Sequence, residues 1–186
     1  MFKATETSMT DEQLIHGCVE GNAVAQKLLY DTYSRKMMGV CLRYASDYEE
    51  AQDILQDGFV KVYQKLGSFQ HKGSLEGWIR RTVVNTALDN FRRNKQHRHQ
   101  VELGAVDYLL EADDNVLSSL AAKDLLKIIQ KLPSGYRTVF NLFAIEGYSH
   151  KEIADQLEIS ENTSKSQFRK AKAYLQRFLP KEKAIR

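Results

Sequence analysis

The chain contains no segment in which polar and apolar residues alternate long enough to predict a β-strand. Helix signals are dense instead, with only two prolines and ten glycines among 186 residues. Three capping boxes mark helix starts, because a hydroxyl residue and a Glu or Gln three positions later satisfy each other's backbone N–H groups. They are Thr10 with Gln13, Ser46 with Glu49, and Ser149 with Glu152. The sequence predicts an all-α protein.

Further signals place the other helices. Asn22 and Ser160 are helix caps, and a helix begins after Ser74 and runs to about Arg93. Pro180 closes the last helix, because proline cannot continue the backbone hydrogen bonding.

Charge divides the chain into blocks, although the net charge is only +3. Residues 47–57 hold five acids and no base, and residues 79–100 hold six bases and one acid. Residues 101–118 hold five acids and no base, and residues 161–186 hold eight bases and two acids. The acidic block has no apolar period. We therefore predict two small helical domains, at residues 7–93 and 119–180, joined by a flexible acidic linker at residues 94–118.

The chain is expected in the cytoplasm. No apolar run approaches the roughly 20 residues that cross a bilayer, and the N-terminus lacks a signal-peptide core. Cys18 and Cys41 lie in helix-patterned segments, which favours buried thiols in a reducing compartment.

Residues 149–175 predict a helix-turn-helix. An inward stripe recurs along the second helix at helical spacing, and a polar, basic stripe lies opposite. Short polar side chains for base edges and cations for phosphates suit the DNA major groove. The inward stripe is Ser164, Phe168, Ala171, Leu175 and Phe178. The candidate duplex contacts are Asn162, Thr163, Lys165, Ser166, Arg169 and Lys170.

The first half offers an acidic stripe. On the helix that starts near Tyr48, one face is apolar and predicted to be core, through Leu55, Phe59, Val62 and Leu66. The opposite face carries two acids beside a valine, which suits a basic partner helix better than solvent. This acidic stripe is Asp53, Gln56, Asp57 and Val60.

The helix after Ser74 carries a tryptophan among bases, a combination that binds single-stranded nucleic acid by stacking and charge. Asp89 interrupts the bases and is interpreted as a brace for Arg92 or Arg93. The preceding loop is flanked by glycines, and its polar atoms suit a flipped base. The candidate single-strand contacts are Ser68, Phe69, Gln70, His71, Lys72, Trp78, Arg81, Asn85, Arg92 and Arg93.

Together the two halves resemble the extracytoplasmic-function (ECF, group four) sigma factors of bacterial RNA polymerase, over residues 11–175. Three motifs in the family's order carry the resemblance. The first is residues 50–63, EAQDILQDGFVKVY; the second is Trp78-Ile79-Arg80-Arg81 with Asn85, Asp89 and Arg92. The third is Leu132-Pro133 with Arg137, Val139 and Phe140, leading into Glu146-Gly147-Tyr148-Ser149 and Glu152-Ile153-Ala154.

The resemblance implies a sigma factor that binds core RNA polymerase and directs promoter recognition and DNA melting. The first half would be sigma region two, with the acidic stripe on the clamp helices of the beta-prime subunit. The loop at residues 68–72 would capture an unpaired base of the minus-ten element. The second half would be sigma region four, contacting the beta flap and reading the minus-thirty-five element as duplex. No cofactor and no enzymatic activity are implied.

Three departures from the family pattern also carry expectations. Glu158 replaces the usual glycine of the helix-turn-helix, so the turn is expected to use a helix-compatible variant. Ser164 replaces an inward valine, so its hydroxyl is expected to bond a carbonyl such as that of Ser160. Residues 163–167 resemble Bacteroidetes members, which implies a FecR-like membrane anti-sigma partner.

Other classes remain as alternatives. A one-component helix-turn-helix regulator would act as a dimer on palindromic half-sites. A nuclease would need clustered acids for a divalent metal, and Asp53 with Asp57 is the one candidate pair in the sequence. A zinc site from His16, Cys18 and Cys41 has poor spacing.

Overall fold

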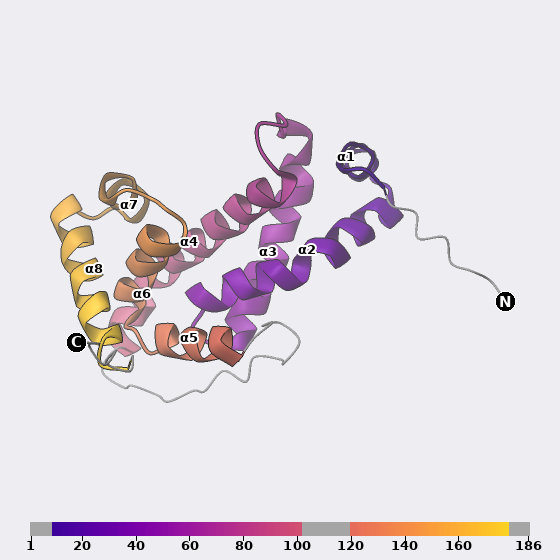
Figure 1. The fold of residues 1–186 in the computed structure, drawn as a ribbon. Helices are drawn as coiled ribbons and strands as arrows, with labels where there is room; N and C mark the ends of the chain where they lie inside the picture. Colours follow the sequence, from indigo (N-terminus) through magenta and orange to yellow (C-terminus); the bar gives the residue numbers. More distant parts are fainter. Residues whose placement is uncertain (1–8, 102–119, 179–186) are drawn as a thin grey trace, which may run out of the picture.

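The computed structural model describes residues 9–101 and 120–178, and every regular element in these ranges is helical (Figure 1). This confirms the predicted all-α class. The first range holds α1 (Asp11–Val19), α2 (Ala23–Tyr44), α3 (Tyr48–Lys65), the short η1 (Leu66–Ser68) and α4 (Leu75–Val101). The second holds α5 (Leu120–Gln130), α6 (Ser134–Phe140), the π-helical η2 (Asn141–Ile145), α7 (His150–Leu157) and α8 (Glu161–Leu175).

Most predicted helix starts are confirmed. Thr10 and Ser149 form capping boxes, and the side chains of Asn22 and Ser160 cap α2 and α8. The box predicted at Ser46 with Glu49 is wrong by one residue. Asp47 caps α3 through the Glu50 N–H at 2.7 Å, and the Ser46 N–H donates to the Glu50 carboxylate at 2.6 Å. A charged carboxylate is the better acceptor at the positive end of a helix.

The first half is organised around α2, α3 and α4, which cross one another in Figure 1. The predicted core stripe of α3 is confirmed, since its four residues are buried: Leu55, Phe59, Val62 and Leu66. Gly58 allows α3 and α4 to approach closely, because a Cβ there would lie 3.1 Å from Val83 Cγ2. The close crossing holds the exposed faces of both helices in a fixed relation.

Helix α4 extends beyond its expected end near Arg93, to Val101. The predicted linker of residues 94–118 therefore begins as helix. Polarity suggested a loop there, but residues 94–101 contain neither Gly nor Pro, and Lys, Gln and Arg are good helix formers. Residues 102–118 and Pro180 lie outside the described residues.

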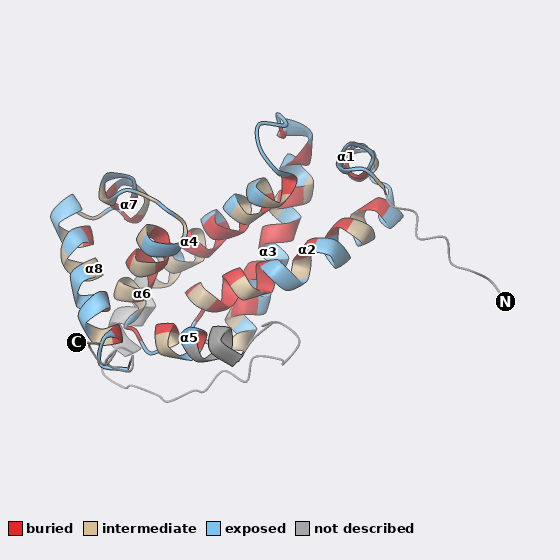
Figure 2. Cartoon of the chain, viewed as in Figure 1, coloured by how far each residue is buried: buried red, intermediate tan, exposed pale blue. Residues whose placement is uncertain are grey.

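The two halves share one hydrophobic core (Figure 2). Second-half residues Leu126, Val139, Leu142, Ile153 and Leu157 belong to the same buried cluster as the core of the first half. A smaller cluster holds α8 in place, through Leu132, Ala171 and Leu175. Phe178 was predicted to continue this buried stripe and is 41% exposed, because α8 ends at Leu175 and helical spacing stops there.

Cys18 and Cys41 are both buried as free thiols. Among the described residues, no helix combines the length and apolar character needed to span a bilayer.

Candidate interfaces for nucleic acid and a partner protein

The acidic stripe lies on the outer face of α3. Asp53, Gln56 and Asp57 are exposed, and Val60 is 49% exposed. Two buried neighbours, Leu55 and Phe59, turn this face outward, because residues three and four apart share a side of a helix. An exposed valine one turn beyond the carboxylates gives a surface that combines apolar area with negative charge.

One predicted single-strand residue lies beside this stripe. The Arg93 Nη2 atom is 3.6 Å from Asp57 Oδ2, and both side chains are more than half exposed. Together with Asp53, Gln56, Asn90 and Asn94 they line a shallow pocket of about 360 Å³ between α3 and α4. Arg93 therefore lies with the acidic stripe, far along α4 from Trp78.

The loop between η1 and α4 presents polar side chains to solvent. Ser68, Gln70, His71 and Lys72 are exposed, whereas Phe69 is buried. The Phe69 ring lies 5.7 Å from that of Trp78 and 4.9 Å from that of His71, centroid to centroid. Phe69 thus anchors the loop from beneath. Phe69 was predicted among the residues that contact a base. Because its ring is buried, only the exposed residues of the loop are accessible for such contacts.

Positive backbone angles shape the same loop. His71 has φ 54° and Gly73 has φ 101°, and the Ser68 hydroxyl donates to the Lys65 carbonyl at 2.7 Å. The positive φ at both positions lets the chain turn between η1 and α4.

The predicted single-strand face of α4 is basic and partly aromatic. Arg81, Asn85 and Arg92 are exposed, and Trp78 is half-buried against the core. Asp89 accepts hydrogen bonds from Lys61 at 2.8 Å and from Arg92 at 2.7 Å. The interpretation of Asp89 as a brace for Arg92 is confirmed, and Lys61 of α3 is a partner that the sequence did not reveal.

Helices α7 and α8 form the predicted helix-turn-helix. Ile153, Ala154 and Leu157 of α7 are buried, as are Ser164, Ala171 and Leu175 of α8. The polar stripe of α8 faces outward, with four exposed and two half-buried members. The exposed members are Asn162, Lys165, Arg169 and Lys170, and the half-buried ones are Thr163 and Ser166.

Local contacts constrain part of this stripe. The Thr163 N–H donates to the Ser160 hydroxyl at 3.0 Å, and the Ser166 hydroxyl donates to the Thr163 carbonyl at 3.0 Å. Lys165 pairs with Glu161 at 2.6 Å and lowers the pKa of that carboxyl. The Lys170 ammonium lies 5.8 Å from the centre of the Tyr136 ring. Arg169 projects from the middle of the stripe.

Two expectations about this motif are wrong. Glu158 keeps the left-handed turn of a glycine, with φ 54° and ψ 48°, where a helix-compatible variant was expected. The Ser164 hydroxyl bonds His150 Nδ1 at 2.9 Å rather than a backbone carbonyl. The His150 ring stacks on Phe143 at 4.3 Å, which holds its nitrogen opposite Ser164.

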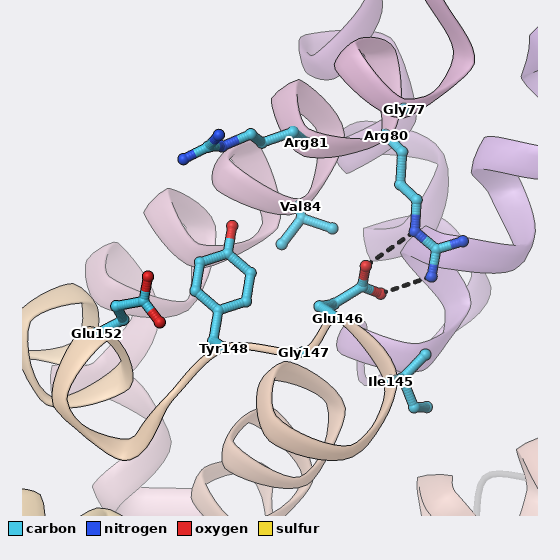
Figure 3. A pocket seen from close by; sticks show the side chains of 9 residues that line it. All are labelled: Gly77, Arg80, Arg81, Val84, Ile145, Glu146, Gly147, Tyr148 and Glu152. Carbon is cyan, nitrogen blue, oxygen red and sulfur yellow. Dashed lines mark hydrogen bonds and ion pairs between the residues drawn. The ribbon is translucent and has the colours of Figure 1, made fainter. Parts of the chain in front are cut away.

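Sequence reasoning missed an ion-pair cluster between the two halves (Figure 3). Glu146 Oε1 accepts from Arg43 Nη2 at 2.9 Å and from Arg80 Nη2 at 2.9 Å, and Glu146 Oε2 accepts from Arg80 Nε at 2.8 Å. The Glu146 side chain is only 7% exposed. These contacts raise the pKa of Arg80. The partners are 66 and 103 positions apart, so no local pattern signals the cluster.

A polar pocket of about 570 Å³ lies beside this cluster, between the first turns of α4 and the turn before α7 (Figure 3). Arg80 and Arg81 come from the first half, and Glu146, Tyr148 and Glu152 come from the second. The second half therefore stands next to Arg81 of the predicted single-strand face.

Comparisons with known proteins agree on one family. Residues 29–97 match the family described as Sigma-70 region 2, and residues 122–175 match Sigma-70, region 4. RNA polymerase sigma-H factor of Pseudomonas aeruginosa is 27% identical, covering 93% of this chain and 95% of that protein. ECF RNA polymerase sigma factor SigW of Bacillus subtilis is 28% identical over 81% of this chain and 87% of its own length.

A solved structure shares the fold. It is the sigma factor RpoE in a co-crystal with the anti-sigma factor NepR from Bartonella quintana, with a TM-score of 0.53 and 20% identity. The match covers 84% of this chain and 98% of that one.

Proposed function

Since the chain belongs to the sigma-70 family and is an ECF-type RNA polymerase sigma factor acting in transcription initiation, we propose a task for each of its surfaces. The acidic stripe binds core polymerase, the loop and α4 hold the melted minus-ten element, and α8 reads the minus-thirty-five duplex. The observation that carries the assignment is that one chain presents an acidic-apolar helix face and two separate basic faces. The site of action is the cytoplasm, with the polymerase.

The acidic stripe is proposed to bind the clamp helices of the beta-prime subunit. Its support is the exposure of Asp53, Asp57 and Val60 on a helix whose opposite face is fixed in the core. Removal of water from Val60 supplies affinity, and the carboxylates select a basic partner and steer its approach.

The test is a pull-down with purified core polymerase. Asp53→Lys with Asp57→Lys is expected to abolish association while the far-ultraviolet circular dichroism stays unchanged. Glu20→Lys with Asp31→Lys is the matched control, because both acids are exposed away from α3, Glu20 just after the end of α1 and Asp31 on α2. Equal retention of the stripe variant and the control would refute this assignment.

The exposed residues of the loop at 68–72, together with Trp78, Arg81, Asn85 and Arg92, are proposed to hold the unpaired minus-ten strand. The support is a half-buried tryptophan next to exposed cations, since bases stack on aromatic faces while cations hold phosphates. Arg93, which lies beside Asp57 at the far end of the same helix, is proposed to contact this strand as well. Captured bases have already left the stack, so melting needs no ATP.

This assignment is tested by permanganate footprinting on a promoter upstream of the protein's own gene, with core polymerase present. His71→Ala with Lys72→Ala is expected to reduce thymine reactivity in the melted region and to leave association with core polymerase unchanged. An unchanged footprint would rule out a role for the loop.

Helix α8 is proposed to read the minus-thirty-five element, and the second half to contact the beta flap. Arg169 is exposed in the centre of the polar stripe, and Asn162 and Lys165 flank it on the same helix. Arg169→Ala is expected to weaken duplex binding at that element by about 1 to 3 kcal/mol. Arg177→Ala is the control, because Arg177 is exposed beyond the end of α8. Losses of equal size would show that charge alone is being measured.

We also propose that the chain is a group-four, Bacteroidetes-like factor controlled by a FecR-like membrane anti-sigma protein. The support is the run at residues 163–167 and the resemblance stated above. In-cell crosslinking followed by membrane fractionation tests it: the chain is expected in the membrane fraction with a single-span partner. Recovery of the crosslinked chain with soluble proteins alone would contradict it.

A further inference from the structure

A buried serine hydroxyl joins α8 to the start of α7. Ser164 is fully buried, with 0% of its surface exposed. Its Oγ atom lies 2.9 Å from Nδ1 of His150, the first residue of α7. The Ser160 carbonyl, one turn earlier, accepts the backbone N–H of Ser164 at 3.0 Å and not its hydroxyl. Within the described part of the chain, His150 is therefore the one side chain that bonds this hydroxyl.

The direction of this hydrogen bond follows from burial. A hydroxyl hydrogen that is removed from water needs an acceptor, because an unpaired buried donor is costly in free energy. His150 Nδ1 is the acceptor within reach, so the Ser164 hydroxyl donates and Nδ1 carries no hydrogen. A neutral imidazole has one hydrogen on its two ring nitrogens. The bond to Ser164 therefore places that hydrogen on Nε2.

Two aromatic rings hold the imidazole in one orientation. The Phe143 ring stacks on it at 4.3 Å and 12°, and the Phe168 ring meets it edge-on at 5.9 Å, centroid to centroid. His150 Nε2 has no hydrogen-bond partner among the described residues, and it is not one of the buried polar atoms that lack a partner, so it reaches solvent. One ring nitrogen is thus bonded inside the motif, and the other offers its hydrogen to a ligand.

The accessible nitrogen of His150 lies in basic surroundings. Lys151 follows His150 on α7, Lys165 follows Ser164 on α8, and both lysines are exposed. The pKa of the Glu161 carboxyl is lowered first by its bond to Lys165 and also by the charge of Lys151, so both lysines lie near the start of α8. Glu161 pairs with Lys165 at 2.6 Å, which leaves the charge of Lys151 for an anion.

The geometry of the motif identifies this anion as a DNA phosphate. In a helix-turn-helix the second helix enters the major groove, while the first helix crosses the sugar-phosphate backbone. His150 begins the first helix and is bonded to the second, so its Nε2–H lies beside the groove that α8 would occupy. Phosphate contacts fix the register of a reading helix without reading sequence themselves.

We propose that Ser164 is a positioning residue for recognition of the minus-thirty-five element: its buried hydroxyl holds His150 as the neutral tautomer whose Nε2–H donates to a backbone phosphate. Neither residue belongs to the candidate duplex contacts named from the sequence. The proposal rests on the proposed function, because the phosphate belongs to the element assigned to α8.

Nitrogen-15 NMR of the full chain tests the tautomer directly. The chain has five histidines, which backbone assignment distinguishes. At about pH 8, where an imidazole is ordinarily neutral, wild-type His150 is expected to carry its hydrogen on Nε2 and to show Nδ1 as a hydrogen-bond acceptor. A hydrogen on Nδ1 would overturn the proposal. This measurement needs no variant, so it applies even where a substitution of Ser164 prevents folding.

A matched pair of variants tests the hydroxyl. Valine and threonine have nearly the same shape, and only threonine carries the hydroxyl. In holoenzyme formed from the full chain and core polymerase, Ser164→Val is expected to bind a promoter duplex from upstream of the protein's own gene about three- to tenfold more weakly. Ser164→Thr is expected to match the wild type. Equal affinities of the two variants, both folded by circular dichroism, would overturn the proposal, because a serine that only fills space is replaced equally well by either.

The dependence of binding on salt separates a neutral donor from a charge. A lysine that neutralises a phosphate releases a counterion on binding, whereas a neutral N–H releases none. Lys151→Ala is expected to reduce the slope of log affinity against log salt concentration by about 1. Ser164→Val is expected to lower affinity and leave the slope unchanged. A reduced slope in Ser164→Val, or an unchanged slope in Lys151→Ala, would overturn the proposal.

The two levels of inference fail in different ways. Wild-type holoenzyme that does not bind the promoter duplex would refute the proposed function. The tautomer of His150 is measured in the free chain without DNA, so it is tested separately. Promoter binding by the wild type together with equal binding by Ser164→Val and Ser164→Thr would refute the role of Ser164 alone.

Discussion

Glu158 holds a backbone conformation that disfavours any residue with a side chain. Its φ of 54° and ψ of 48° lie in the left-handed region, at the position where α7 ends and the turn to α8 begins. Glu158→Gly is expected to raise the free energy of unfolding by about 1 kcal/mol, because glycine adopts this region without the steric cost of a Cβ. Urea denaturation measures the change.

Asp155→Gly is the control for this prediction. Asp155 is exposed within α7, where glycine lowers helix stability by a few tenths of a kcal/mol. If Glu158→Gly also lowered the free energy of unfolding, contacts of the Glu158 side chain would have to offset the cost of its left-handed backbone conformation.

The buried thiol of Cys41 makes the free energy of unfolding decrease at alkaline pH. Burial raises the pKa of its thiol from 9.0 to about 12. The folded state therefore keeps a proton that the unfolded state loses, so the contribution of this group is complete below pH 9 and declines as the pH rises toward 12. Tyr63, whose pKa burial also raises to about 12, acts in the same sense from pH 10 upward.

We expect the free energy of unfolding to fall between pH 9 and 12, and to fall less steeply in Cys41→Ala, by up to about 4 kcal/mol over that range. Chemical denaturation at a series of pH values measures the slopes. Parallel curves for the two proteins would contradict the assigned role of Cys41.

At the scale of single residues, the sequence reveals contacts between near neighbours and misses those across a turn. Thr10 and Asn22 were predictable as caps because their partners lie two or three positions away. Ser164 was predicted to bond a nearby carbonyl, and it bonds His150, 14 positions away. Phe69 was predicted to contact a base together with the rest of its loop, yet its ring is buried and lies against Trp78.

At the scale of helices, the end of α2 depends on elements that follow it much later. Asn141 is fully buried and donates to the Arg43 carbonyl at 2.7 Å. Asn141→Ala is expected to lower the free energy of unfolding by about 2 kcal/mol, since it leaves a cavity and removes the side-chain partner of that carbonyl.

Asn162→Ala serves as the control for this prediction, because Asn162 is exposed on α8; it is expected to change stability by less than about 0.5 kcal/mol. Thermal or urea unfolding compares the two variants. Equal stability of both would mean that water satisfies the end of α2 as well as the amide does.

Helix starts were more predictable than helix ends in this chain. Starts are signalled by one capping side chain, as at Ser149 and Ser160. The end of α4 has no such signal, and its helix continues to Val101 through a polar run that resembles a loop by composition. The π-helical turn of η2 leaves no mark in the periodicity, because it differs from an α-helix by one residue per turn.

At the scale of the whole molecule, the two halves are expected to unfold together. They share one buried cluster, and Glu146 pairs with Arg43 and Arg80 of the first half. Gln130 and Asn141 also donate to carbonyls at the end of α2. Fluorescence of Trp78, the single tryptophan, reports on the first half, and far-ultraviolet circular dichroism reports on all helices. The two urea transitions are expected to coincide, as they do in a cooperative unit. Separate midpoints would show two independently folding domains.

The hydrophobic core shared by the two halves could not be predicted from the sequence. Charge blocks suggested two domains, and each helix-rich half was identified by its own pattern. Contacts such as Arg43 with Glu146 join residues about a hundred positions apart, and no local period encodes such a pairing. The surfaces that face solvent were easier to predict. In an amphipathic helix the apolar stripe faces the core, so the opposite side must be exposed.

The π-helical turn has an evolutionary consequence. Because a π-helical turn holds one residue more than an α-helical turn, deleting one residue from Asn141–Ile145 would restore ordinary helical winding and leave Glu146 on nearly the same side of the axis. The chain could therefore lose one residue at this turn and still keep Glu146 facing Arg43 and Arg80.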